Sequence, residues 1–592
     1  MYQQSPYIAP LGDITLALDV AGLSELLALE AFGHVERDSV LAALEEFGKL
    51  ASNVIAPSDR IGDIEGIRFY PSTGVVKTPD AFHKAYDEYV SGGWGALSFP
   101  ADHGGGGLPS VVGLAIQEIF ASANVALSLN PVLTQSAIEA LLISGTDEQR
   151  SIYLPRLLTG EWTGTMNMTE PDAGSDLGGI RTQAELNGDG LWSVTGTKIF
   201  ITWGDHDLAS NVIHFVLART PDAPNGTQGL SLFIVPKFVP AADASLGARN
   251  TLRCLRIEEK LGIHGSPTCV MEYAGAVGEL VGPLHGGLRT MFTMMNTARL
   301  SIGIQGPAVA ERAFQQAREY ATNRFQGRAI GVTFEGRSPI IDHLDVRRML
   351  LTMTTTTQAS RMLLFFARAH NDLASAASGE EHRERSQQLV DLLTPIAKAW
   401  STDMGFRAAS LGVQVLGGVG YIEESGMAQR LRDARIASIY EGTNGIQALD
   451  LVARKISRGG GKWVRELLRE AQDIIPSPIP AGDTLAESYV ILGETLSTLK
   501  EATDWMLERI ATARQDVVAG ATSYLELFGN ALGGWLMIKR ARLAVLSNHV
   551  EVERIVAESN FFAAEVVARS AGLGGPIRAG AGNLLAPIGA VI

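Results

Sequence analysis

Apolar side chains recur at every third or fourth position over most of this chain, which is the spacing of helices that pack one face against a core. Val40, Leu44 and Phe47 show this spacing near the start. The pattern continues to about Arg156, with breaks at clusters of Gly and Pro. It predicts a helical domain in the first part of the chain.

The pattern changes in the middle of the chain, where apolar and polar residues alternate and β-branched residues become common. Between two such runs, Asn187-Gly-Asp-Gly190 has the residue types of a hairpin turn. We therefore expect an antiparallel sheet. Its predicted strands include Trp192–Thr202, Val212–Thr220, Leu230–Val235 and Thr268–Tyr273.

Helical spacing returns after Gly286, in long segments that can pack as a bundle. These segments are Leu288–Asn323 with an interruption at Gly306-Pro307, Asp342–Ser378 and Arg385–Leu416. The run Arg458-Gly-Gly-Gly461 predicts a flexible joint before more helical sequence. The tail from Gly572 lacks periodicity and predicts a poorly fixed terminus.

The chain has 592 residues, more than a single hydrophobic core organises, so several domains are expected. Together the patterns predict a mainly α fold with a central β domain. The parts are an N-terminal extension, an N-terminal helical domain, a middle antiparallel β domain, a C-terminal helical bundle and an additional C-terminal helical domain. Their expected bounds, in that order, are residues 1–40, 41–162, 163–282, 283–457 and 462–592.

Composition and charge exclude several classes of function. The formal net charge is -15, and Lys and Arg do not gather in a stripe, so nucleic acid is not an expected partner. Cys254 and Cys269 are the only cysteines, which predicts neither a metal cluster nor a disulfide framework. No signal peptide is visible, and no run of about 20 uninterrupted apolar residues predicts a membrane-spanning helix. A cytoplasmic location is the default expectation.

Common catalytic motifs are absent from the sequence. There is no G-x-G-x-x-G, no G-K-[ST] phosphate loop, no H-E-x-x-H and no G-x-S-x-G. Three separated segments are instead dense in Gly, Thr, Ser and acidic residues. They are Met168-Thr-Glu-Pro-Asp-Ala-Gly-Ser-Asp176, Gln414-Val-Leu-Gly-Gly-Val-Gly-Tyr421 and Ile439-Tyr-Glu-Gly-Thr443.

In this order, the three segments resemble the flavin loop, the neighbouring-subunit diphosphate loop and the catalytic-base segment of acyl-CoA dehydrogenases. The likeness covers about Leu41 to Lys455 and includes Thr197-Lys-Ile-Phe-Ile-Thr202. Tyr7-Ile-Ala-Pro-Leu11 and the additional C-terminal domain further resemble a longer bacterial branch. That branch includes 3-methylmercaptopropionyl-CoA dehydrogenases and broad-range fatty acyl-CoA dehydrogenases.

The resemblance implies that Glu441 is the catalytic base. The α-hydrogen of a thioester is a poor acid, so a carboxylate base needs a dry site, and apolar Ile439 and small Gly442 beside Glu441 suit that need. Gly442 is expected to contact the acyl group. Some branches of the family place the base directly before the helix Arg that matches Arg299, but Ala298 stands there in this chain. Arg299 is expected to lie beside the active site and bind substrate.

The resemblance also implies FAD as cofactor and no metal. Phe200 stands where the family usually has Trp, which keeps a stacking surface but removes an indole donor. Ser175 is expected where the flavin and the pantetheine of CoA pass each other, and therefore to bind both. The expected FAD-binding residues are Met168, Thr169, Ser175, Phe200, Thr202, Arg324, Gln326, Gln414, Gly417, Gly418, Thr443 and Asn444.

The resemblance implies further that four of these residues complete the FAD site of a neighbouring subunit, which predicts a homodimer. They are Arg324, Gln414, Gly417 and Gly418. The additional domain can cover the face through which smaller family members pair dimers, so a tetramer is less expected.

Three functions remain open. The first is α,β-dehydrogenation of an acyl-CoA to a trans-2-enoyl-CoA in fatty acid β-oxidation, with electrons passed to an electron-transferring flavoprotein. The second is an acyl-CoA oxidase that uses oxygen, and the third is a non-catalytic acyl-CoA-binding flavoprotein. The sequence leaves the acyl chain undecided, although Leu127–Leu133 is expected near the acyl pocket.

Overall fold

The computed structural model describes residues 6–586, except residues 189, 242, 332, 334 and 335. The described residues form two compact units. Unit 1 takes the described residues of Met1–Leu44, Pro109–Glu118 and Ile302–Ile592, and unit 2 takes those of Glu45–Leu108 and Ile119–Ser301. The boundaries between the two units fall within three helices: α3 (Arg37–Leu50), α6 (Ser110–Ala123) and α9 (Gly287–Gly303).

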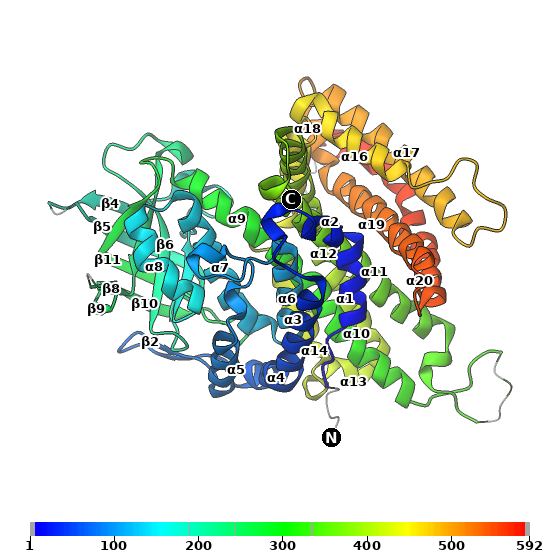
Figure 1. The fold of residues 1–592 in the computed structure, drawn as a ribbon, viewed down its shortest axis with the longest axis horizontal. Helices are drawn as coiled ribbons and strands as arrows, with labels where there is room; N and C mark the ends of the chain where they lie inside the picture. The colour runs from blue at the N-terminus through cyan, green and yellow to red at the C-terminus, as the bar shows by residue number, and fades with distance from the viewer. Residues whose placement is uncertain (1–5, 189, 242, 332, 334–335, 587–592) are drawn as a thin grey trace. The chain divides into compact units, whose positions relative to one another are not determined.

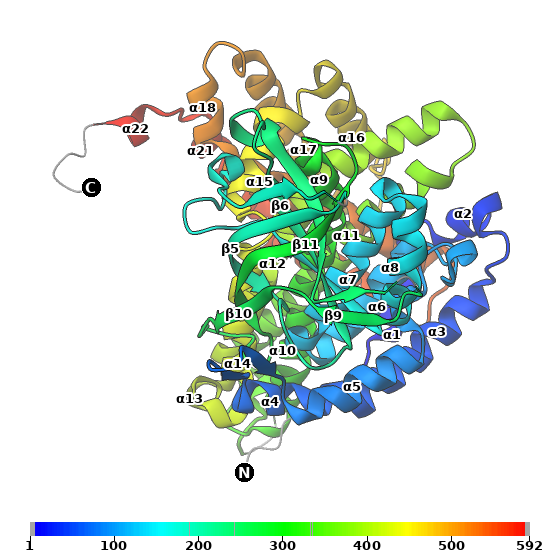
Figure 2. The ribbon, with the colours of Figure 1, turned by 90° about the vertical axis from the view of Figure 1, so that its left-hand side faces the viewer.

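Unit 2 is organised around a seven-stranded sheet in the order β10-β11-β5-β4-β6-β3, with β7 pairing with both β11 and β6. Figure 1 and Figure 2 show β5, β6, β10 and β11 of this sheet. The strands are β3 (Trp162–Asn167), β4 (Gln183–Leu186), β5 (Trp192–Thr202), β6 (Asn211–Arg219), β7 (Leu230–Pro236), β10 (Leu252–Ile257) and β11 (Thr268–Val281).

The alternating pattern located β5, β6, β7 and β11, although β11 continues beyond the predicted Tyr273 to Val281. Strand β5 has the predicted bounds, and it pairs antiparallel with β4 through the predicted hairpin, in which the N–H of Asn187 donates to the carbonyl of Leu191. Asp189 of that turn lies outside the described residues. The sheet is not wholly antiparallel, because β3 and β6 run parallel. Such a pair can form because the two strands are joined by a long connection that includes β4 and β5.

Helices and two short ribbons complete unit 2. The ribbon β1 (Arg68–Tyr70) and β2 (Val75–Lys77) falls where only helices were predicted, because strands of three residues leave too short a pattern. A second ribbon pairs β8 (Phe238–Pro240) with β9 (Leu246–Arg249). The helices are α4 (Ala56–Glu65), α5 (Asp80–Ser91), α7 (Val125–Ser144) and α8 (Asp147–Thr159), of which α7 packs on β3.

Helix α7 also bears on the expectation that no helix spans a membrane. Among the described residues it is the one helix long and apolar enough to do so by length and composition, and 78% of its apolar window is buried inside the structure. A buried core helix of a folded domain passes the same test, so the expectation stays a prediction.

Unit 1 contains the predicted helical bundle. Helix α12 packs along both α10 and α11. The interruption of the first segment falls at Ile304, so α10 begins before Gly306-Pro307 and holds the proline in its first turn, where a missing N–H costs nothing. The helices are α10 (Gln305–Asn323), α11 (Leu344–Ala376), α12 (Glu380–Leu416), α13 (Gly418–Tyr421), α14 (Met427–Ala434) and α15 (Asn444–Asp450).

The additional C-terminal segment is helical, as predicted. Helix α19 packs on α11 and α12 as well as on its own neighbours (Figure 1). The prediction of a poorly fixed tail is wrong for α21, in which Ile577 is fully buried, whereas α22 buries none of its residues. The helices are α16 (Lys462–Gln472), α17 (Ala486–Arg509), α18 (Arg514–Ala519), α19 (Ala521–Leu546), α20 (Val552–Glu565), α21 (Gly574–Arg578) and α22 (Gly582–Leu585).

Buried charges connect the N-terminal extension to the additional domain. Helix α1 (Leu11–Val20) presents Asp13, which accepts hydrogen bonds from Arg540 at 3.0 Å and Arg554 at 3.1 Å. Both arginines also bind Glu558 at 2.7 Å. Burial alone would raise the pKa of Asp13, but Arg540 and further arginines outweigh it and hold the pKa below its ordinary value. The extension, which continues into α2 (Leu23–Leu27), is thus tied to α19 and α20 by paired charges.

We predict that Arg540→Met lowers the free energy of unfolding by about 1–3 kcal/mol, because it removes one of the two cations that Asp13 and Glu558 share and leaves part of their hydrogen bonding unsatisfied. Urea unfolding followed by circular dichroism measures the change. Arg569→Met is the matched control, since Arg569 and Glu565 form an exposed pair whose loss should cost about 0–1 kcal/mol. Equal effects of the two substitutions would contradict the role of the buried network.

Candidate active site

In unit 2 the loop that resembles the flavin loop directly follows β3. Glu170 and Ala173 bond to each other in both directions, N–H to carbonyl, which closes the loop into a tight turn. The N–H of Ile199 donates to the carbonyl of Thr169 at 2.9 Å, so Thr169 lies next to Phe200 of β5. Ser175 is exposed at the far end of the loop.

A buried ion pair holds this loop from beneath. The ammonium of Lys198 is fully buried and donates to the carbonyl of Met168 at 3.0 Å and to Glu170 Oε1 at 2.8 Å. Burial lowers the pKa of Lys198 to about 8, so the amine is still protonated at pH 7. Burial would raise the pKa of Glu170, but Lys198 and the hydroxyl of Thr182 outweigh it and hold the pKa below its ordinary value. Both groups are charged at neutral pH.

Phe200 has the features of a residue that stacks on a ligand. The residue is 60% exposed although it lies within a strand of the sheet, and its backbone is left-handed at φ 59°. A non-glycine residue in that conformation carries strain, which the surroundings must hold. The neighbouring Thr202 accepts a hydrogen bond from Thr165 Oγ1 at its carbonyl, at 2.8 Å. An exposed aromatic face beside Thr169 fits the isoalloxazine ring of FAD.

Arg299, the expected substrate-contacting residue of α9, is buried, and its guanidinium lies 6.0 Å from the ring centre of Phe292. This placement differs from a solvated helix arginine.

In unit 1 the base segment lies between Ser438 and the start of α15. Glu441 is half-buried and left-handed at φ 54°, and Gly442 follows at φ 86°. A left-handed conformation costs an L-residue such as Glu441 about 1–2 kcal/mol, so the turn must be held by its neighbours. Tyr440 donates its hydroxyl to Gln305, and burial raises the pKa of Tyr440 well above its ordinary value.

Two polar side chains hold the carbonyls of this turn. Lys398 of α12, fully buried, donates to the carbonyl of Gly442 at 3.0 Å and to Asn444 Oδ1 at 2.9 Å. Gln447 Nε2 makes two longer contacts, of 3.4 Å each, to the carbonyls of Glu441 and Gly442. Thr443 caps α15, with its hydroxyl accepting the N–H of Ile446 at 3.2 Å.

The residues expected at the diphosphate of FAD lie at the ends of two packed helices of unit 1. Gly417 ends α12 at φ 62° and is exposed together with Gln414 and Gly418. Arg324 ends α10, is exposed, and accepts the N–H of Ile340 at its carbonyl. The structure thus groups Gln414, Gly417 and Gly418, and separately Arg324 and Gln326, in positions open to a ligand or a second subunit.

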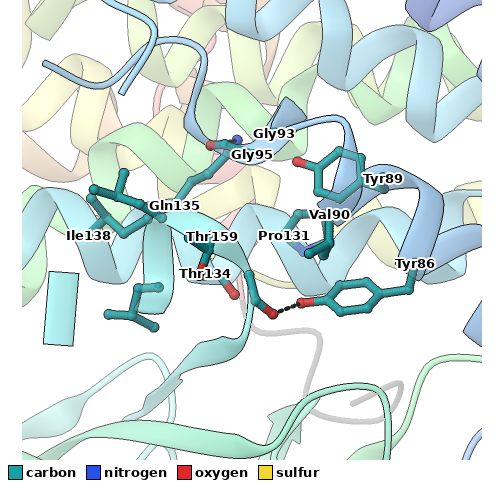
Figure 3. A pocket seen from close by; sticks show the side chains of 13 residues that line it. Tyr86, Tyr89, Val90, Gly93, Gly95, Pro131, Thr134, Gln135, Ile138 and Thr159 are labelled. Carbon is teal, nitrogen blue, oxygen red and sulfur yellow. Dashed lines mark hydrogen bonds between the residues drawn. The ribbon is translucent and has the colours of Figure 1, made fainter. Parts of the chain in front are cut away.

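Figure 3 shows a pocket in unit 2 that is distinct from these residues. Its wall includes Tyr86, whose hydroxyl donates to the carbonyl of Gly160 at 2.8 Å. It encloses roughly 320 Å³ of empty space, part of which is open to solvent. Of the residues singled out from the sequence, Pro131 of the segment Leu127–Leu133 lines it, and we assign the pocket no ligand.

The sequence analysis missed Lys198 and Lys398 as site residues. The signal was present, because each is a lone lysine in an apolar stretch, Thr197-Lys-Ile-Phe-Ile201 of the β domain and Ile396-Ala-Lys-Ala-Trp400 of the bundle. A buried lysine requires oxygen partners, and the partners of both lysines belong to segments with expected function.

Comparison with known proteins identifies the family. Four models match in chain order: the N-terminal domain of acyl-CoA dehydrogenase over residues 74–161, the middle domain over 165–275, the C-terminal domain over 285–456, and an "Acetyl-CoA dehydrogenase C-terminal like" domain over 466–587. The chain belongs to the acyl-CoA dehydrogenase family, whose members are FAD-dependent oxidoreductases. The predicted fold class and cofactor are confirmed.

Within the family, the chain is similar over nearly its whole length to a particular enzyme. It is 44% identical over 573 residues to 3-methylmercaptopropionyl-CoA dehydrogenase of Ruegeria pomeroyi, covering 95% of this chain and 96% of the relative. The resemblance to the longer bacterial branch is thereby confirmed.

Two solved structures share the fold. ACDH-11 of Caenorhabditis elegans, in complex with C11-CoA, superposes with a TM-score of 0.78 at 21% identity and covers 96% of this chain and 93% of its own. An acyl-CoA dehydrogenase of Bacillus anthracis complexed with FAD gives a TM-score of 0.74 at 20% identity, covering 91% and 88%.

We predict that Glu170→Gln lowers the melting temperature at about pH 7 and that the difference from wild type shrinks as the pH falls below 4.5, the ordinary pKa of Glu. A carboxyl whose pKa is depressed by folding stabilises the protein above its unfolded pKa and loses that contribution as it becomes protonated. Scanning calorimetry across this range provides the measurement. A difference that is constant with pH would show that the charge of Glu170 does not hold the loop.

Proposed function

We propose that this chain converts an acyl-CoA thioester to a trans-2-enoyl-CoA, with Glu441 as the base that removes the α-proton. The observation that carries the proposal is the strained, left-handed turn at Glu441, held in place by Lys398 and Gln447. Backbone strain at a residue such as Glu441 is expected where its carboxylate takes part in a reaction. Bound FAD would supply the acceptor for the hydride that leaves the β-carbon.

We further propose which residues hold the flavin and the substrate. Phe200 would stack on the ring, while Met168, Thr169, Ser175 and Thr202 would surround it. Gln326, Thr443 and Asn444 would lie near the rest of the nucleotide, with Asn444 acting through its backbone because its side chain is bonded to α12. Ser175, Arg299 and Gly442 would contact the substrate.

A homodimer is the proposed active unit. Gln414, Gly417, Gly418 and Arg324 are exposed at helix ends, where backbone N–H groups and a guanidinium can reach a diphosphate. In the proposed dimer they complete the FAD site of the second copy. We propose an electron-transferring flavoprotein as electron acceptor and the cytoplasm as location.

We predict that Glu441→Gln keeps FAD bound but slows flavin reduction by acyl-CoA by about 10²–10⁴-fold, because an amide fills the same space and cannot accept the α-proton. Anaerobic stopped-flow absorbance of the flavin measures the rate constant. Glu487→Gln, at an exposed carboxylate of the additional domain, serves as control and should reduce as wild type does. Undiminished reduction by Glu441→Gln would remove Glu441 from the mechanism.

The name of the Ruegeria pomeroyi relative suggests a methylthio acyl chain, and the reaction itself asks only for adjacent α and β carbons. We therefore predict that straight-chain and methylthio acyl-CoAs have the highest kcat/KM in a panel from four to sixteen carbons that also contains a branched analogue. Neighbouring chain lengths should overlap, because each methylene discriminates by about 1–3 kcal/mol.

This preference would be refuted if only branched thioesters were turned over.

The same assay separates the dehydrogenase from the oxidase alternative, because an oxidase forms one hydrogen peroxide for each product and a dehydrogenase does not. A protein that binds FAD and acyl-CoA but gives no turnover would favour the third alternative, a non-catalytic acyl-CoA-binding flavoprotein.

A further inference from the structure

The function proposed so far gives Lys398 no role other than its hydrogen bonds. Burial of its side chain nevertheless costs free energy. It lies in the middle of α12, with its ammonium fully buried, and the two hydrogen bonds described above go to the carbonyl of Gly442 and to the side chain of Asn444. Both acceptors belong to the four-residue stretch that begins at Glu441. A buried ammonium needs such oxygen partners, so the helix and the stretch are bound to each other.

Asn444 extends this connection. Its Nδ2 donates to the carbonyl of Ala399 at 3.1 Å, to Thr402 Oγ1 at 3.0 Å and to Asp403 Oδ1 at 2.8 Å. With its Oδ1 taken by Lys398, the amide is satisfied entirely by α12. Asp403 also accepts the hydroxyl of Ser438 at 3.1 Å, so the chain is fixed to α12 on both sides of Glu441.

The turn between these two attachments is the strained one. Glu441 and Gly442 are both left-handed, and relaxation of Glu441 to a right-handed conformation would redirect its carboxylate. The contacts of Gln447 with the carbonyls of the turn are long, at 3.4 Å. The bond from Lys398 is shorter, at 3.0 Å, which makes it the stronger restraint.

We propose that Lys398 is a positioning residue for Glu441, which keeps the carboxylate aimed by holding the carbonyl of Gly442 and, through Asn444, the start of α15. This inference rests on the proposed role of Glu441 as the base. It concerns the rate of proton removal, and Lys398 itself is not among the residues proposed to contact FAD or CoA.

The test is Lys398→Met in the full-length, FAD-loaded protein, with butyryl-CoA as the probe. The flavin reduction rate constant at saturation should fall about 10–100-fold, because displacement of a reacting group by about 1 Å is enough for such a loss. The half-saturating concentration should change by less than about three-fold, since the lost restraint acts on the chemical step. The FAD content should be unchanged.

Lys539→Met is the matched control. It makes the same substitution at another largely buried lysine of unit 1, whose amine lies near the rings of Phe366 and Trp535, and its reduction rate should stay within about two-fold of wild type. An equal loss of rate in both variants would reduce the role of Lys398 to general stability and overturn the proposal.

Asn444→Ala keeps the test decisive if Lys398→Met does not fold. It should also slow reduction, and the double variant should be no slower than the slower single one, because both substitutions break the same restraint. A wild-type rate of flavin reduction in Asn444→Ala, or losses of rate that multiply in the double variant, would overturn the proposal.

If Glu441→Gln is inactive while Lys398→Met reduces normally, only this inference fails. If Glu441→Gln reduces normally, the assignment of the base fails.

Discussion

A positive charge inside a protein must be met by oxygen atoms, and this requirement shapes a candidate functional segment in each unit. In unit 1 the ammonium of Lys398 binds the carbonyl that follows Glu441, and in unit 2 the ammonium of Lys198 binds the carbonyl that precedes Thr169. The two lysines lie on regular elements, a long helix and the longest predicted strand. In each unit a buried lysine side chain therefore fixes an irregular functional segment to a rigid element, at a position where water does not take its place.

The additional C-terminal domain reaches the same helix. Two residues after Lys398, the indole of Trp400 donates to Asn530 Oδ1 of α19 at 2.9 Å. Gly529 lies so close to that ring that an added Cβ would stand 2.3 Å from it, so only glycine allows the two helices to approach in this way. The domain thus buttresses α12 at the level of the lysine. Asp13 also attaches the additional domain to the N-terminal extension. The two segments that lie outside the common core are therefore joined to each other as well as to the core.

Periodicity predicted the elements that are long and regular and failed where the pattern was short. Strand β5 and the hairpin before it have the expected bounds because alternation over eleven residues is unambiguous. The β1–β2 ribbon was missed, and the helical turns near Ile577 were mistaken for a loose tail because Gly and Ala hide the apolar spacing. At the site, the resemblance of sequence motifs to the family predicted Glu441 and the flavin loop. Lys198 and Lys398 were not predicted, because their role depends on hydrogen-bond partners that are distant along the chain.

The central claim is that a strained turn, held from α12, presents Glu441 to the α-carbon of an acyl thioester. A structure of the FAD-loaded protein with an unreactive acyl-CoA analogue tests it most directly. The account predicts a carboxylate oxygen of Glu441 within about 3–3.5 Å of the α-carbon, with the left-handed turn and the bond from Lys398 to Gly442 intact. A different carboxylate at that position, or Glu441 turned away from the thioester, would contradict it.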